Sequence, residues 1–174
     1  MSKLARKPID IKDVEVTFKD DILTVKGKHG ELTQKVDSNV ELKIDKESIM
    51  VVSNHAAFLG LYASLIRNMV IGVTDLYNET LILKGVGYRV SFSNNVLNFN
   101  LGYSHPVTYT VPESIKIEVV SPTQIKVTGF DKQLVGQVAA EIIMLRPAKK
   151  DPYKQKGIQR ERDNIIKKVG KKVK

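Results

Sequence analysis

Apolar and polar residues alternate along two stretches of the chain, residues 16–25 and 90–99. A period of two is typical of β-strands that bury one face. Two adjacent polar residues interrupt the alternation in each stretch, and side chains of their type tolerate the positive φ of a tight turn. These pairs are Asp20-Asp21 and Asn94-Asn95. Each stretch is therefore predicted to be a β-hairpin.

The two hairpins match each other at a constant offset of 74 residues. After one inserted residue the match resumes, with apolar Leu32, Val36, Val40, Leu42 and Ile44 against Val107, Val111, Ile115, Ile117 and Val119. Each copy adds one more alternating segment, 48–52 and 124–128. Short alternation is common in any sheet protein, so coincidence is the alternative. An offset that holds across a whole hairpin favours an internal duplication.

A helix is predicted to close each copy. In the first copy, helical spacing joins Phe58, Leu61, Tyr62, Leu65, Ile66, Met69 and Val70. In the second it joins Leu134, Val138, Ile142 and Leu145, with Asp131 as the N-cap and Pro147 as the stop. The predicted fold class is α+β. We expect two tandem duplicated domains, each an antiparallel sheet with one helix packed on a face, plus a basic C-terminal tail.

The expected domains are residues 1–80 and 81–148, followed by a basic tail at 149–174. The junction is expected near 78–81, where polar residues interrupt the apolar pattern. The apolar stretch 56–73 is broken by Ser64, Arg67 and Asn68, which indicates a buried amphipathic helix rather than a membrane span.

The net charge of the chain is concentrated at its C-terminal end. Residues 146–174 hold 12 Lys and Arg against 3 Asp and Glu, whereas residues 1–145 hold 16 of each sign. A polycationic segment on a neutral body is attracted to polyanions, so RNA, DNA or an anionic membrane surface are the natural partners. A merely solvated basic terminus is the alternative. Because the tail has few apolar residues, we expect it to order only on binding RNA.

Residues suited to catalysis or metal binding are scattered. His29, His55 and His105 fall in separate loops or element ends, without a companion carboxylate at ligand spacing, and the chain has no Cys. Gly85-Val86-Gly87 leads into a strand-like alternation rather than a helix, so it does not open a dinucleotide site. Gly85 and Gly87 are interpreted as structural glycines, at a bulge or a close backbone approach. The sequence predicts no enzyme, metal, cofactor or small-molecule substrate.

The tail provides the candidate RNA-binding residues. Lys and Arg can neutralise phosphates, and Tyr153 can stack on an unpaired base or a ribose. The candidates are Arg146, Lys149, Lys150, Tyr153, Lys154, Lys156, Gly157, Arg160, Arg162, Lys167, Lys168, Lys171 and Lys172.

Five short motifs in this order resemble the bacterial form of large-subunit ribosomal protein six. They are Arg6-Lys7-Pro8-Ile9, Val25-Lys26-Gly27-Lys28-His29-Gly30, Asn68-Met69-Val70-Ile71-Gly72-Val73, Gly85-Val86-Gly87-Tyr88-Arg89 and Pro152-Tyr153-Lys154-Gln155-Lys156-Gly157-Ile158. The resemblance implies two duplicated α+β domains in a structural, non-enzymatic protein. It also implies binding to large-subunit ribosomal RNA, chiefly through the second domain and tail, near the stalk base and the factor-binding region in the cytoplasmic ribosome.

The resemblance further implies that neighbouring large-subunit proteins are partners and that translation factors pass nearby. It assigns RNA contact to Tyr153, Lys154, Lys156 and Gly157. The chain departs from the family pattern at Lys150, Gln155 and the pair Gln159-Arg160.

Two other function classes compete with this hypothesis. An RNA-acting enzyme would need clustered carboxylates, histidines or metal ligands, which the sequence does not provide. A peripheral membrane protein would need bulky apolar anchors beside the cations. The end of the tail offers only Ile158, Ile165, Ile166 and Val169. We therefore expect no membrane partner.

Overall fold

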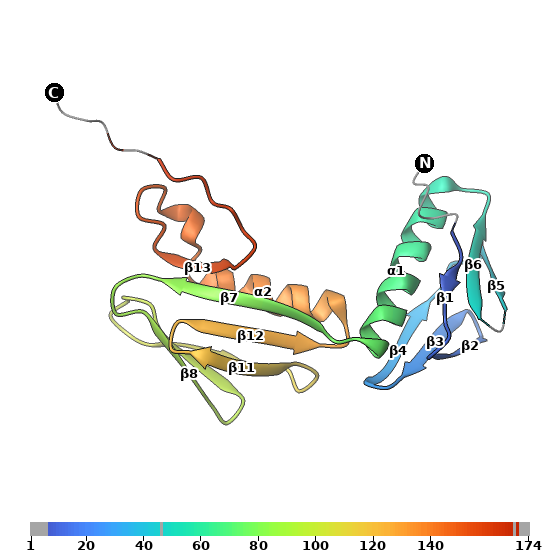
Figure 1. The fold of residues 1–174 in the computed structure, drawn as a ribbon, viewed down its shortest axis with the longest axis horizontal. Helices are drawn as coiled ribbons and strands as arrows, with labels where there is room; N and C mark the ends of the chain where they lie inside the picture. The colour runs from blue at the N-terminus through green and yellow to red at the C-terminus, as the bar shows by residue number, and fades with distance from the viewer. Residues whose placement is uncertain (1–6, 46, 169, 171–174) are drawn as a thin grey trace. The chain divides into compact units, whose positions relative to one another are not determined.

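The computed structural model describes residues 7–45, 47–168 and 170, and the chain forms two compact units (Figure 1). The first unit comprises the chain up to Tyr77 together with the short segment Phe130–Lys132. The second comprises Asn78–Gly129 and the chain from Gln133 onward. The second unit therefore includes the segment that the sequence separates as a basic tail.

The described residues of the first unit up to Thr74 form six strands and one helix. They are β1 (Ile9–Asp10), β2 (Glu15–Lys19), β3 (Ile22–Gly27), β4 (Gly30–Lys35), β5 (Val40–Ile44), β6 (Ser48–Ser53) and α1 (Ala56–Thr74). The strands pair into two antiparallel sheets, in the orders β2-β3-β4 and β1-β6-β5. The first predicted hairpin is β2 and β3, and its turn residues Asp20 and Asp21 have φ of 50° and 59°.

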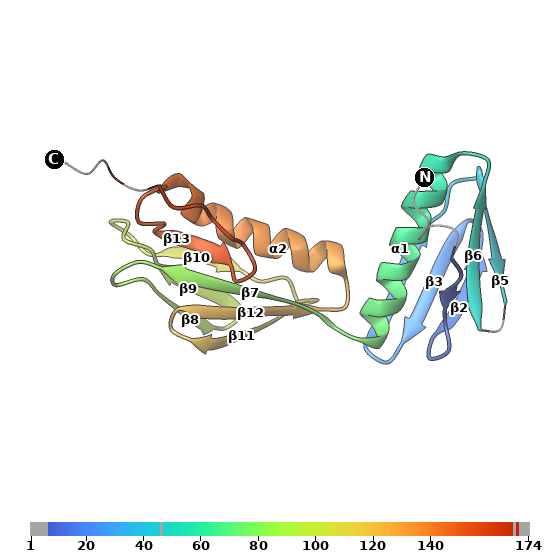
Figure 2. The ribbon, with the colours of Figure 1, turned by 45° about the horizontal axis from the view of Figure 1, so that its top comes forward.

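The second unit repeats this order of elements. Its elements are β7 (Tyr77–Lys84), β8 (Arg89–Ser93), β9 (Val96–Asn100), β10 (Val107–Thr110), β11 (Lys116–Ser121), β12 (Gln124–Gly129), α2 (Lys132–Leu145), the 3₁₀ turn η2 (Ala148–Lys150) and β13 (Gly157–Arg160). The turn residues of its hairpin, Asn94 and Asn95, have φ of 48° and 59°. In Figures 1 and 2, α2 lies along the sheet that holds β7 and β12.

The sheet orders confirm the predicted α+β duplication. The order β10-β9-β8 corresponds to β4-β3-β2, and β11-β12-β7 corresponds to β5-β6-β1. Each unit therefore has two antiparallel sheets where one was expected. The two units divide between Tyr77 and Asn78, at the start of β7 and at the edge of the segment where the junction was expected. Strand β13 is an addition, since the described strands of the first unit include no counterpart.

Helix α1 supplies much of the first unit's core. Tyr62, Ala63, Ile66, Met69, Val70 and Val73 are buried with Leu23, Val25 and Ile49 of the strands. Leu61 belongs to the predicted helix, but its side chain is 51% exposed. By length and composition α1 could cross a membrane. The face that α1 buries in this core accounts for many of its apolar residues.

The C-terminal segment departs from the expectation that it orders only on binding RNA. Strand β13 pairs antiparallel with β7, with Ile158 opposite Leu83 and Arg160 opposite Leu81. The Ile158 side chain is fully buried, and its N–H donates to the carbonyl of Arg146 at 2.7 Å. Burial of Ile158 and the pairing of β13 with β7 thus stabilise this part of the C-terminal segment in the absence of RNA.

Candidate nucleic-acid interface

The chain between α2 and β13 forms a compact loop, residues 148–156, here called the tail loop. Asp151 organises it through both carboxylate oxygens. Its Oδ1 accepts the N–H groups of Tyr153 at 3.2 Å and Lys154 at 3.1 Å, and Oδ2 accepts that of Lys156 at 3.4 Å. The hydrogen bond from Lys154 is the main cause that lowers the pKa of Asp151. The carboxylate therefore holds the backbone of three residues that were predicted to contact RNA.

Five side chains of the tail loop are exposed to solvent. Tyr153 is 55% exposed, and the lysines of the loop are exposed as well. They are Lys149, Lys150, Lys154 and Lys156. Their ammonium groups and the Tyr153 ring are available to phosphates and to bases, respectively.

Gln155 joins the tail loop to the chain that follows β13. It adopts φ of 55°, its N–H donates to the Asp151 carbonyl, and its Nε2 donates to the Ile165 carbonyl at 2.6 Å. The N–H of Lys168 donates to the Pro152 carbonyl at 2.9 Å. These bonds return residues 163–168 to the tail loop, so the exposed Lys167 and Lys168 add their charge there. The departure from the family pattern at Gln155 therefore has a structural consequence.

Two further predicted cations share one carboxylate. Arg160 Nε lies 3.4 Å from Glu79 Oε1, and Arg162 Nη2 lies 3.1 Å from Glu79 Oε2. The Glu79 side chain is 13% exposed and Arg162 is 70% exposed. Because two cations meet one anion, the cluster keeps a net positive charge. Glu79 also ties the chain after β13 to β7 of the same sheet.

Arg146 is placed inside the second unit. Its guanidinium lies 4.6 Å from the Tyr103 ring centroid and 5.5 Å from that of Tyr88, and its Nη1 donates to the Leu101 carbonyl at 2.6 Å. The Tyr103 hydroxyl donates to the Leu145 carbonyl at 3.0 Å. Cation–π contacts and a charge-assisted hydrogen bond thus fix the end of α2 to the chain between β9 and β10.

The glycines singled out in the sequence stand where a side chain would not fit or where φ is positive. A Cβ on Gly157 would lie 2.5 Å from the Arg146 carbonyl oxygen, and its φ is +148°. A Cβ on Gly85 would lie 2.8 Å from the Tyr88 ring, and Gly87 has φ of +75°. Gly157 lets β13 approach the end of α2, while the other two form the turn between β7 and β8.

The fold and the basic tail loop agree with what comparison with known proteins finds. The family model described as ribosomal protein L6 matches residues 12–76 and 84–161. This chain belongs to the ribosomal protein L6 family. The first matched segment lies within the first unit, and the second lies within the second unit except for Phe130–Lys132. The family model thus matches both copies of the internal duplication.

Relatives of the L6 family match nearly the whole chain. The large ribosomal subunit protein uL6 of Thermotoga maritima is 43% identical over 99% of this chain and all of the relative. That of Natranaerobius thermophilus is 45% identical over 98% of each chain. The uL6 protein of Borrelia hermsii is 44% identical over 98% of this chain and 97% of the relative.

In this L6 family member, the predicted RNA-binding residues separate into two groups. The lysines and Tyr153 of the tail loop, with Lys167 and Lys168, lie exposed around one loop, whereas Arg146, Gly157, Arg160 and Arg162 make internal contacts. Lys171 and Lys172 lie outside the described residues. Within the described ranges, no cluster of three or more His, Asp or Glu side chains could hold a metal ion.

Proposed function

We propose that this chain binds large-subunit ribosomal RNA mainly through its second unit and its basic C-terminal tail, near the stalk base and the factor-binding region. As a member of the ribosomal protein L6 family, the chain is a structural constituent of the ribosome and is located there, in the cytoplasm. Its position near the stalk base rests on the family resemblance. Its mode of RNA binding is argued from the tail loop.

The observation that carries the proposal is the tail loop itself. Asp151 holds the backbone, while Tyr153, Lys154 and Lys156 are exposed. A fixed backbone reduces the ordering cost when phosphates are bound. Sequence-independent contact with phosphates and riboses suits folded RNA, whose shallow minor groove is recognised largely by shape.

The charge of the first unit also favours RNA binding by the second unit and the tail. Residues 1–79 hold 11 basic and 12 acidic residues, so this part of the chain has no excess of cations. We expect it to contribute less to RNA affinity and to face neighbouring large-subunit proteins or passing translation factors. The role is structural rather than catalytic, as in the family.

The test uses the full chain with two sets of six Lys→Gln substitutions. The first set changes the exposed lysines of the tail: Lys149, Lys150, Lys154, Lys156, Lys167 and Lys168. The control set changes six exposed lysines of the first unit: Lys12, Lys19, Lys26, Lys28, Lys35 and Lys43. Dissociation constants for a large-subunit rRNA transcript are measured between 50 and 200 mM salt.

The slope of log affinity against log salt reports the number of phosphates neutralised. Each lost phosphate contact reduces its magnitude by about 0.7–0.9. If most of the tail lysines contact phosphate, the tail variant loses about 3–5 units of slope, and the control variant stays within about one unit of the unaltered chain. A larger loss in the control variant would show that the first unit provides the main RNA contacts.

A further inference from the structure

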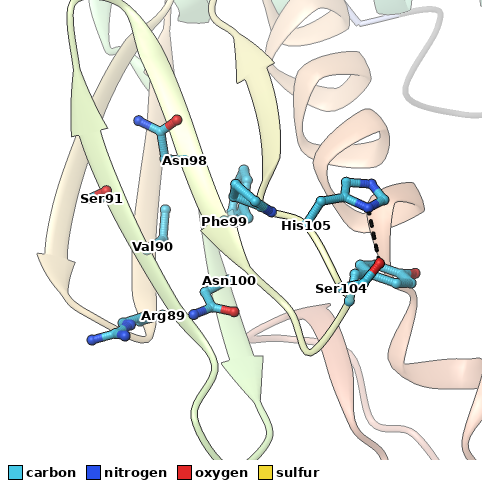
Figure 3. Close-up of a pocket in the computed structure, with 10 residues that line it drawn as sticks. Arg89, Val90, Ser91, Asn98, Phe99, Asn100, Ser104 and His105 are labelled. Atoms are coloured by element: carbon cyan, nitrogen blue, oxygen red, sulfur yellow. Dashed lines mark hydrogen bonds between the residues drawn. The ribbon is translucent and has the colours of Figure 1, made fainter.

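The second unit has a polar pocket that the sequence did not reveal. It has a volume of about 430 Å³ and is lined by Arg89, Val90, Ser91, Asn98, Phe99, Asn100, Tyr103, Ser104, His105 and Pro106. Figure 3 shows strands β8 and β9 carrying Arg89, Ser91, Asn98 and Asn100 on one side, and the loop carrying Ser104 and His105 on the other. The pocket lies within the size range of ligand sites, about 300–1,000 Å³.

Most of the lining comes from β8 and β9, chiefly from the face that carries Arg89, Ser91, Asn98 and Asn100. On this face Arg89 stands opposite Asn100 and Ser91 opposite Asn98. The other wall is the six-residue connection from β9 to β10, residues 101–106. Sheet faces of this kind usually carry charged pairs, but the lining includes no carboxylate and one cation, Arg89.

The duplicated unit gives an internal comparison. At the offset of 74, Arg89, Asn98 and Asn100 correspond to Glu15, Thr24 and Lys26 of the first unit. There β3 and β4 are joined by a tight turn, in which Gly27 pairs with Gly30. The first unit thus has Glu15 and Lys26 at the positions that Arg89 and Asn100 occupy in the second unit. The second unit also has a longer loop, which contains Tyr103 and His105. The scaffold alone therefore does not dictate the pocket's chemistry.

The loop that walls the pocket is held rigidly. The Tyr103 ring stacks 4.6 Å from the Arg146 guanidinium on one partner and 6.4 Å from the His105 ring on another, with 22° between the two ring planes. Ser104 Oγ lies 3.4 Å from His105 Nδ1. Arg146 lies between α2 and the tail loop, so the pocket wall and the segment that leads into the tail loop share one set of contacts. The tail loop begins at Ala148, two residues after Arg146, so it follows directly on a residue that contacts this wall.

We propose that this pocket binds one unpaired nucleotide of the RNA that the tail holds. Asn98 and Asn100 each offer a donor and an acceptor for the edge of a base, His105 offers a ring face for stacking, and Arg89 offers a guanidinium for phosphate. The open, carboxylate-free lining suits an anionic polymer. The inference rests on the proposed function, since it takes the RNA as ligand, and it adds a base-binding site to a phosphate-binding surface.

The test compares matched double variants of the full chain. N98A/H105A removes an amide and a ring from the pocket. The control T24A/H29A removes the corresponding strand residue and a histidine of the first unit's turn. His29 and His105 are exposed, and Thr24 and Asn98 are half-buried, so both variants should keep the fold, which circular dichroism and thermal unfolding check.

Affinity is measured with the large-subunit rRNA transcript. Loss of stacking and base contacts should weaken binding by N98A/H105A about tenfold or more at every salt concentration. The salt slope should not change, because no phosphate contact is removed. T24A/H29A should bind as the unaltered chain does.

The outcomes separate this inference from the proposed function. If the six-lysine tail variant loses slope while N98A/H105A binds like the unaltered chain, the proposed function stands and the pocket is not a nucleotide site. If N98A/H105A binds the transcript normally but fails to enter large subunits, the pocket docks a protein, which also overturns the inference. No binding by the unaltered chain would refute the proposed function itself.

Discussion

Replacement of Ile158 by Ala should detach the tail from the second unit. The Ile158 side chain is fully buried on β13, opposite Leu83 of β7. Truncation of a buried Ile to Ala removes its apolar contacts and leaves a cavity, at a cost of about 2–5 kcal/mol. Since β13 is a four-residue edge strand, much of this cost should appear as local opening of the strand rather than as unfolding of the whole unit.

Amide hydrogen exchange measures that local opening directly. The Ile158 N–H donates to the Arg146 carbonyl and the Glu161 N–H to the Thr80 carbonyl, so both amides report on the docking of β13. A cost of about 2 kcal/mol corresponds to about thirtyfold faster exchange at these two amides. The change should be small at the Val111 amide, which donates to Asn95 far from β13 in the sequence.

Ile166 supplies the matched control, because it is an isoleucine of the same tail that is 87% exposed. Ile166→Ala should leave exchange at Ile158 and Glu161 unchanged, and should change the free energy of unfolding by less than about 0.5 kcal/mol. An Ile158→Ala variant whose amide exchange and urea unfolding match those of Ile166→Ala would contradict the docking role of Ile158. Such a result would mean that β13 does not contribute to the stability of the sheet.

Three further predictions concern the contacts around β13. Gly157→Ala should destabilise the chain by about 1–3 kcal/mol in urea unfolding, because its Cβ would meet backbone atoms at 2.5 Å. Gly136→Ala, on α2 with no atom near its Cβ, should stabilise it by about 0.5–1 kcal/mol, and a similar loss for both would contradict this. Glu79→Gln should cost about 1–3 kcal/mol, because Arg160 and Arg162 lose their anion, and an unchanged unfolding midpoint would exclude that contribution. The pKa of Asp151 is lowered in the folded chain, chiefly by the N–H of Lys154, so the ionised carboxylate stabilises the fold above its ordinary pKa of 3.8. This contribution is lost as the pH falls through the lower, folded pKa, so Asp151→Asn should destabilise the chain at pH 7 and match the unaltered chain in acid. A difference in stability between Asp151→Asn and the unaltered chain that does not depend on pH would contradict this role of the Asp151 carboxylate.

The hairpins could be predicted from the sequence because their signal is local. Alternation with a period of two defines the strands, and the pairs at 20–21 and 94–95 are residue types that tolerate positive φ. The helices were predictable for the same reason, since α2 begins directly after Asp131 and ends two residues before Pro147. Leu61 shows the limit, because helical spacing does not tell which edge of an apolar stripe another element covers.

Strand β13 could not be predicted because its partner is distant in the sequence. Its composition is that of a solvated basic tail, and only the pairing of residues 157–160 with β7 makes it part of a sheet. The role of Glu79 could not be predicted for the same reason, since the two arginines that it contacts lie some eighty residues further along the chain. Long-range pairing of this kind leaves no periodic signal.

The sequence predicted the charged part of the candidate site but not the parts that depend on long-range contacts. Charge density points to the tail from the sequence alone, and the tail loop lysines are exposed in the structure. The internal role of Arg146 depends on Tyr88 and Tyr103, and the polar pocket depends on strands and a loop that meet only in the fold. Neither feature has a local sequence pattern.

Ultraviolet cross-linking of intact large ribosomal subunits, followed by mass spectrometry of the peptides joined to RNA, would show which part of this chain contacts ribosomal RNA. We expect cross-links at Tyr153 and its neighbours in the tail loop, and few in the first unit. Cross-links confined to residues before Tyr77, with the tail loop free of RNA, would contradict it.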